Sequence, residues 1–248
     1  MRAFWIALQF LTSIPAPHRD APAAVDLGRS VLYYPLVGLL IGALLVAAWA
    51  ILANVDAMLV AALLLVVWVA TTGGLHIDGF ADTADAWVGG YGDRDKTLAI
   101  MKDPRRGAAA IVGVMLLLLL KYAALTVLLR NDEWPALLVA PVIGRAALVI
   151  LFLTMSYVRP GGIGAAHAAH LPRRTAIAVL GATLLVILAI DVAMIIPLIV
   201  AAVVVAVLRY MVRCRLGGST GDTLGASCEI VEAAVLVTAA ILLDGAHG

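Results

Sequence analysis

The sequence predicts an all-α fold: a polytopic bundle of about seven membrane-spanning helices, preceded by a short N-terminal helix at the membrane interface. Three observations predict it. Hydrophobic residues make up 64% of the 248 positions and charged residues only 13%, whereas a soluble domain carries about 25% charged residues. The apolar residues form stretches long enough to cross a bilayer core of about 30 Å. Basic residues concentrate in alternate connections between these stretches.

The first element is a predominantly apolar run from Ala3 to Leu11. The following Ile14-Pro15-Ala16-Pro17 lacks the small-x-small site at which a secretory signal peptide is cleaved. Phe4 and Trp5 are typical anchors at a bilayer surface. We therefore expect a short interfacial helix, and a cleaved signal peptide is the less favoured alternative.

Seven apolar stretches follow, each about long enough to span the bilayer at about 1.5 Å per residue. They lie at about 31–53, 56–73, 107–129, 134–156, 175–190, 192–208 and 225–243. The fifth and sixth are short and separated by Asp191 alone, which predicts either a helical hairpin or a broken, tilted pair. No linker is long enough to separate soluble domains, so we expect one integral membrane domain over residues 1–248.

The distribution of positive charge predicts the orientation of the chain. The connections at 15–30, 74–106, 157–174 and 209–224 hold thirteen Lys and Arg residues, and the alternate connections hold only Arg130. Because basic loops stay in the cytoplasm, we expect a multi-pass protein of the cytoplasmic (inner) membrane with its N-terminus and its active face inside. A formal net charge of +1 without a dense basic stripe argues against nucleic acid as a partner.

The most informative motif is Gly73-Gly74-Leu75-His76-Ile77-Asp78-Gly79-Phe80-Ala81-Asp82-Thr83-Ala84-Asp85-Ala86-Trp87. On a helix, Asp78, Asp82 and Asp85 stand at i, i+4 and i+7, so their carboxylates project from one face. Their mutual repulsion is relieved by protonation or by a bound cation. Oxygen ligands favour Mg²⁺ or Mn²⁺, which makes a divalent metal site our expectation. The alternative is an amphipathic helix with a solvated acidic face.

A second motif, Gly217-Gly218-Ser219-Thr220-Gly221-Asp222-Thr223-Leu224-Gly225-Ala226, precedes Glu229 and Glu232. Backbone N–H groups of such a glycine-rich loop can cradle a phosphate before a helix N-terminus. Asp222 and Glu229 align on one helical face, and acids within a membrane helix are costly enough to indicate function. The alternative is a flexible loop that caps the last helix, with Asp222 at the positive end of the helix dipole.

Basic residues supply a third group. Lys102-Asp103-Pro104-Arg105-Arg106-Gly107 offers cations suited to a diphosphate, although the same residues also fit a topology signal. Arg145 lies in the middle of an apolar stretch and must face the bundle interior, where it meets a buried carboxylate or an anionic substrate. His76 is open to metal ligation, hydrogen bonding or proton transfer.

Together these segments resemble the cobalamin synthase family of adenosylcobinamide-GDP ribazoletransferases. The resemblance is carried in order by Phe10-Leu11-Thr12-Ser13-Ile14-Pro15, by residues 73–87 and 102–107, and by residues 217–226 with Glu229. It implies a magnesium-dependent transferase that completes the nucleotide loop of cobalamin at the membrane. Adenosylcobinamide-GDP and α-ribazole, or α-ribazole 5′-phosphate, would give adenosylcobalamin, or its phosphate, and GMP.

The resemblance also implies roles for the motif residues. Asp78, Asp82, Asp85 and Asp222 would hold the Mg²⁺ that bridges the diphosphate, and Asp82 or Glu229 would take a proton from the ribazole hydroxyl. The remaining substrate-binding set comprises His76, Lys102, Arg105, Arg106, Arg145, Gly218 and Ser219. Whether the chain forms a homo-oligomer stays open.

Two alternatives remain at this point. CDP-alcohol phosphotransferases also carry aspartates on helices, but Asp78-Gly79-Phe80-Ala81-Asp82 matches their pattern only in part. An ion or solute transporter would line its path with Lys121, Arg145, Glu229 and Glu232. Against a transporter, the acidic residues cluster at one surface, no internal repeat is evident and the external loops are short.

Overall fold

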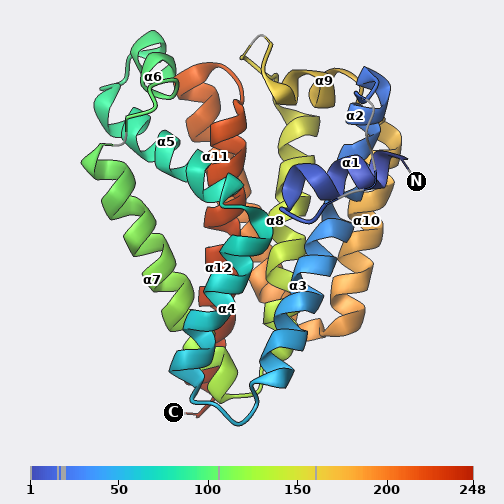
Figure 1. Cartoon of the computed structure of the whole chain (residues 1–248), viewed down its shortest axis with the longest axis vertical. Helices are drawn as coiled ribbons and strands as arrows, with labels where there is room; N and C mark the ends of the chain where they lie inside the picture. Colours follow the sequence, from blue (N-terminus) through green and yellow to red (C-terminus); the bar gives the residue numbers. More distant parts are fainter. Residues whose placement is uncertain (1, 16, 18–20, 106, 160, 248) are drawn as a thin grey trace.

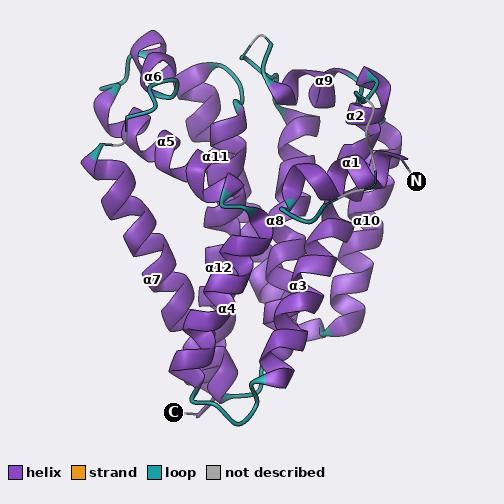
Figure 2. Ribbon diagram, in the orientation of Figure 1, coloured by secondary structure: helices purple, strands orange, loops and turns teal. Residues whose placement is uncertain are grey.

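The structure, a computed structural model, describes residues 2–15, 17, 21–105, 107–159 and 161–247. Throughout these residues the regular structure is helical (Figure 2), and extended backbone pairs at a single parallel bridge between Tyr157 and Ser219. The all-α prediction is therefore confirmed. The bridge joins two loops that lie at the same end of the bundle, and it bears directly on the site described below.

Seven long helices form the bundle. They are α3 (Tyr34–Ile51), α4 (Ala57–Thr72), α7 (Ala108–Arg130), α8 (Trp134–Thr154), α10 (Arg173–Ile190), α11 (Ile195–Leu216) and α12 (Gly221–His247). In the described part of the chain, six helical segments are long and apolar enough to cross a membrane. A seventh is counted when α4 and α5 (Leu75–Gly89) are taken as one bent span. The prediction of about seven spans is confirmed.

The order of burial shows which helices form the centre. The most apolar window of α8 is 78% buried, compared with 11% for α10. Helix α3 lies against α8 along a glycine face, where a Cβ added at Gly38 would come within 2.5 Å of the carbonyl oxygen of Pro141. Small residues of this kind let two membrane helices approach closely. The outer helices instead expose Leu, Ile and Val side chains, as expected of surfaces that face lipid.

Helices α4 and α5 meet at an angle of 91°. Gly73 and Gly74 have φ values of 61° and 70°, the left-handed region in which a side chain is strained. The N–H groups of these glycines close the last turn of α4 by donating to Ala70 and Val69. The turn sends α5 across the end of the bundle, where it packs against α7 and α12 (Figure 1).

The long connections gather at the upper end of the bundle in Figure 1 and the short ones lie toward the lower end. The upper end holds α1 (Arg2–Leu11), α2 (Ala24–Ser30), α6 (Arg94–Ile100), α9 (Ile163–Ala169) and the 3₁₀ turn η1 (Val31–Tyr33) that leads into α3. The N-terminal helix is thus present as expected. Its position relative to a bilayer stays a prediction.

Helices α10 and α11 are separate and are joined by the 3₁₀ turn η2 (Val192–Met194), so the hairpin interpretation is correct. The sequence predicted that the sixth span would end near residue 208, but the corresponding helix α11 continues to Leu216. Its final turns carry Arg209, Arg213 and Arg215, which end the apolar stretch without ending the helix.

Candidate active site

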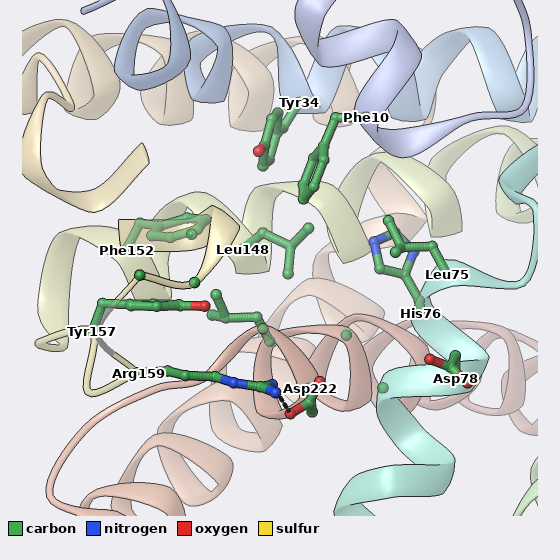
Figure 3. Close-up of a pocket in the computed structure, with 17 residues that line it drawn as sticks. Phe10, Tyr34, Leu75, His76, Asp78, Leu148, Phe152, Tyr157, Arg159 and Asp222 are labelled. Atoms are coloured by element: carbon green, nitrogen blue, oxygen red, sulfur yellow. Dashed lines mark hydrogen bonds and ion pairs between the residues drawn. The ribbon is translucent and has the colours of Figure 1, made fainter. Parts of the chain in front are cut away.

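A cavity of about 430 Å³ opens at the end of the bundle that carries the long connections. Its polar side brings together His76 and Asp78 from α5, Arg159 from the loop before α9, and Asp222 from the first turn of α12 (Figure 3). Its other side is aromatic. The cavity therefore combines opposite charges with a surface suited to a flat apolar group.

Close contact between α5 and α12 brings the two carboxylates to one cavity. A Cβ added at Gly79 would lie 2.9 Å from the backbone oxygen of Asp222, and one at Gly225 would lie 3.3 Å from the backbone of His76. Larger residues at either glycine would push the helices apart. These two glycines consequently allow Asp78 and Asp222, which lie far apart in sequence, to face the same space.

Arg159 forms an ion pair with Asp222 in the lining of this cavity, with its Nη1 3.0 Å from the Asp222 carboxylate (Figure 3). The loop that carries Arg159 is fixed by the bridge between Tyr157 and Ser219. The Val158 N–H donates to the Ser219 oxygen at 2.9 Å, and the Ser219 N–H donates to the Ser156 oxygen at 2.8 Å. A residue larger than Gly218 would collide with the Ser156 oxygen.

The aromatic side of the cavity consists of Phe10, Tyr34, Phe152 and Tyr157. The rings of Phe10 and Tyr34 stack with centroids 6.2 Å apart, and Phe152 meets Tyr34 edge-on at 6.5 Å. The hydroxyl of Tyr34 is buried, and Figure 3 shows it on the cavity side. Burial raises the pKa of the Tyr157 hydroxyl, which keeps that group protonated as a donor.

A second cavity of about 280 Å³ adjoins the first. It is lined by Arg94, Leu98, Met101, Lys102, Val158, Arg159, Thr220 and Asp222. Arg159 and Asp222 thus line both cavities. The second cavity lacks the aromatic surface of the first and carries more positive charge.

The predicted acidic helix is present as α5, but its three carboxylates have different surroundings. Asp78 lines the first cavity. Asp85 instead accepts hydrogen bonds from the N–H groups of Gly107 at 2.5 Å and Ala110 at 2.8 Å, so it caps the start of α7. Asp82 lines neither cavity.

The four aspartates predicted to hold a metal ion do not all lie together. Among the described residues, no three or more His, Cys, Asp or Glu side chains form a group that could hold a metal ion. Mg²⁺ often uses only one or two carboxylates together with substrate phosphates and water. Asp78 and Asp222, two oxygen donors on one cavity, fit that second arrangement.

The glycine-rich loop is used differently from the phosphate cradle predicted at Gly218 and Ser219. The Ser219 N–H is engaged by Ser156, as described above. Thr220 and Thr223 cap α12 reciprocally, each backbone N–H donating to the other's side-chain oxygen at 2.9 and 3.2 Å. Because these donors are already bonded within the protein, the interpretation as a helix cap describes the loop better.

The basic motif divides in a similar way. Lys102 lines the second cavity. Arg105 is exposed and pairs with Asp103 at 2.6 Å, which lowers the pKa of the Asp103 carboxyl to about 2. Arg105 lines neither cavity. Arg106 lies outside the described residues, so its predicted substrate contact stays a prediction.

Deeper in the bundle, four charged side chains form what we call the interior charge network: Lys121, Arg145, Glu229 and Glu232. Lys121 donates to Glu229 and to Glu232 at 2.6 Å each, and Arg145 pairs with Glu232. Arg145 also reaches Nδ1 of His76 at 3.4 Å.

Two predicted roles change with these contacts. Glu229, a predicted proton acceptor, and Arg145, a predicted substrate ligand, are buried in the interior charge network and line neither cavity. Glu229 is neutralised by Lys121 of α7, and Arg145 is neutralised by Glu232 of α12. His76, by contrast, lines the first cavity, and its predicted contact with substrate stays a prediction.

Several residues of the cavity were not found from the sequence. Arg159 was used only to predict the orientation of the chain. Tyr34, Phe152 and Tyr157 lie in or beside apolar stretches, where aromatic residues are common and do not indicate a site. Phe10 was identified only as part of a family segment. A single signal pointed toward Arg159, namely its position just before Gly161 and Gly162, since glycine-rich loops often border binding sites.

Comparison with known proteins adds independent information. A sequence model of the family described as cobalamin-5-phosphate synthase matches residues 3–240. A curated adenosylcobinamide-GDP ribazoletransferase of Pseudomonas fluorescens (strain Pf0-1) is 52% identical over 97% of this chain and 100% of its own length. Proteins of the same name from Pseudomonas savastanoi pv. phaseolicola and Pseudomonas putida (strain W619) are each 51% identical. They cover 98% and 97% of this chain, and 100% and 99% of their own lengths. No solved structure matches the chain.

Proposed function

Because the chain belongs to the cobalamin-5-phosphate synthase family, we propose that it transfers the cobinamide phosphate of adenosylcobinamide-GDP to α-ribazole or α-ribazole 5′-phosphate, with release of GMP. The observation that carries this proposal is the first cavity. Its aromatic side suits the flat benzimidazole of α-ribazole, and its Asp78, Asp222 and Arg159 suit a diphosphate.

Each part of the cavity has a task in such a transfer. The aromatic rings hold the base and thereby orient the ribose hydroxyl toward the diphosphate, which removes much of the entropic cost of bringing two substrates together. The Arg159 guanidinium contacts phosphate oxygens. Asp78 accepts the hydroxyl proton, because it lines the same cavity that holds the benzimidazole of α-ribazole. Glu229, by contrast, is paired with Lys121 inside the bundle.

Magnesium is part of the proposal. Asp222 and one oxygen of the Asp78 carboxylate would hold the ion, which leaves the second Asp78 oxygen to accept the proton, and substrate oxygens would complete the coordination. When bound, Mg²⁺ would neutralise charge on the diphosphate and on the departing phosphate. Since Asp85 caps α7 in this structure, we assign it a structural task in place of metal ligation.

We place the reaction at the cytoplasmic face of the inner membrane. Both cavities open at the end that carries the basic connections, whereas α7, which ends at Arg130, runs to the other end of the bundle (Figure 1). The positive-inside rule puts the basic end in the cytoplasm. A cysteine introduced at Tyr91, an exposed residue of this end, should react with a membrane-impermeant maleimide only after spheroplasts are broken. Labelling in intact spheroplasts would reverse the assigned orientation.

The direct test uses purified protein in nanodiscs with adenosylcobinamide-GDP and α-ribazole. We expect GMP release that requires both substrates and magnesium and that matches formation of the cobalamin product. CDP-diacylglycerol as donor serves as the comparison for the CDP-alcohol phosphotransferase alternative. Transfer from CDP-diacylglycerol alone, or the absence of product with every donor, would contradict the proposal.

A further inference from the structure

The two cavities share a boundary that consists of an ion pair. Arg159 and Asp222 line both cavities, and their charged groups are 3.0 Å apart. The side chains are 33% and 17% exposed, so each retains a surface that a ligand can contact. A group that binds at this pair reaches the aromatic cavity on one side and the basic cavity on the other.

The chemistry of the two cavities differs. The first offers stacked rings and the buried Tyr34 hydroxyl, which suits a planar base with a ring nitrogen. The second offers Arg94 and Lys102 beside Met101 and Leu98, which suits a phosphate attached to a less polar group. The two spaces are therefore not interchangeable for one ligand.

The boundary is held from both sides by the backbone. The Tyr157–Ser219 bridge fixes the segment that leads to Arg159, and the reciprocal cap formed by Thr220 and Thr223 fixes the first turn of α12 at Asp222. Fixed donors placed where charge develops are the usual means of stabilising phosphoryl transfer. The ion pair is thus positioned before any substrate binds.

We propose that the second cavity is the site of the guanylate leaving group, with the reacting phosphorus at the Arg159–Asp222 pair and the acceptor riboside in the first cavity. The inference rests on the proposed transferase function. Phosphoryl transfer requires the attacking and leaving oxygens to lie roughly in line on opposite sides of phosphorus. Two cavities that meet at one ion pair can hold the attacking and the leaving group at the same phosphorus, while the bulky corrinoid stays outside the bundle.

A ribose hydroxyl oxygen of α-ribazole forms a bond to the phosphorus that carries cobinamide, and the bond from that phosphorus to the bridging oxygen breaks. The bridging oxygen and its electron pair leave with GMP. The hydroxyl proton passes to the Asp78 carboxylate, which is exposed and can return it to water. Arg159 contacts the phosphoryl oxygens on which negative charge is concentrated.

The experiment measures whether GMP and α-ribazole occupy separate sites. Wild-type protein in nanodiscs is titrated calorimetrically with α-ribazole, first alone and then saturated with GMP in the presence of magnesium. We expect the Kd for α-ribazole to change less than about twofold, since separate sites do not exclude each other. A strong loss of α-ribazole binding in the presence of GMP would overturn the two-site arrangement.

Variants identify which cavity holds GMP. Lys102→Ala should raise the Kd for GMP about fivefold, from loss of a partly exposed contact with phosphate, and should leave the Kd for α-ribazole unchanged. Lys96→Ala is the matched control, because Lys96 lies on the same end of the protein over the Tyr91 ring and lines neither cavity. An unchanged Kd for GMP in Lys102→Ala, or an equal rise in Lys96→Ala, would overturn the assignment.

Failure of this inference is separable from failure of the proposed function. The same preparations are assayed for transfer from adenosylcobinamide-GDP to α-ribazole. Normal transfer with competition between GMP and α-ribazole would overturn only the two-site arrangement. A lack of transfer in correctly folded wild-type protein would overturn both.

Discussion

Charged side chains occupy two regions of this protein that differ in one decisive respect. The interior charge network is sealed between helices, with its side chains no more than 4% exposed and each charge paired with an opposite charge. The Arg159–Asp222 pair is partly exposed and lines two cavities. Similar ion pairs therefore have different consequences. Burial keeps ligands away from the interior charge network, whereas partial exposure lets a ligand contact the Arg159–Asp222 pair.

The difference teaches how this family combines a membrane fold with a charged substrate. Charges inside the bundle are tolerated because Lys121, Arg145 and the two glutamates neutralise one another. Arg145 then reaches His76, a residue of the first cavity, so the sealed group supports the wall of the open one. Variants in each region should separate stability from activity.

The largest expected effect comes from the sealed region. Glu232→Gln leaves Lys121 and Arg145 with one carboxylate between them in a buried setting. Breaking a buried pair in this way costs about 3–5 kcal/mol of stability. Thermal unfolding in detergent should show a markedly lower midpoint and reduced yield of folded protein. The double variant Glu232→Gln with Arg145→Met, which removes the unpaired cation and keeps the Lys121–Glu229 pair, should recover part of the loss, and failure to recover any of it would contradict the network.

In the open region, Asp222→Asn should act on the rate. The substitution removes the carboxylate that faces Arg159 and lines both cavities. We expect GMP release to fall by about 10²–10³, the usual cost of losing one electrostatic group from a preorganised site, with an unfolding midpoint close to wild type. Asp191→Asn is the matched control, because Asp191 caps the η2 turn at the opposite end and Asn also caps well. Near-normal turnover in Asp222→Asn would exclude the site.

A smaller effect is expected on the aromatic side. Phe10→Leu keeps an apolar side chain and removes the ring that stacks on Tyr34. Loss of base stacking costs about 1–3 kcal/mol in comparable sites, so KM for α-ribazole should rise about tenfold while KM for adenosylcobinamide-GDP stays unchanged. Steady-state kinetics with each substrate varied in turn provides the measurement. A rise confined to the GDP donor would place the acceptor elsewhere.

The smallest effect distinguishes a cap from a metal ligand. Asp85→Ala removes the acceptor for the Gly107 and Ala110 N–H groups, and loss of such a cap costs about 1 kcal/mol. The unfolding midpoint should fall slightly, and the magnesium concentration for half-maximal activity should not change. Asp85→Asn, which can still accept a hydrogen bond, should be milder. A large rise in the magnesium requirement in both variants would restore Asp85 to the metal site.

Much of the fold could be predicted because its signals are local. Apolar length predicted the spans. The spacing of Asp78, Asp82 and Asp85 predicted that their carboxylates would project from one face if the segment is helical, and α5 is helical there. The sequence could not show that Asp85 would turn to α7 while Asp78 faced a cavity. Residues that share a helical face share a direction only approximately, and the packing neighbours on either side determine what each carboxylate meets.

The sequence by itself determined a helical membrane bundle and the end of the molecule where charge collects. Hydropathy, helical period and backbone freedom act over a few residues, so they can be read along the chain. Only the tertiary structure decided that Arg159 would meet Asp222, 63 residues away, and that Glu229 would be sealed against Lys121. Such partners depend on how closely whole helices approach, which here follows from contacts such as those of Gly79 and Gly225.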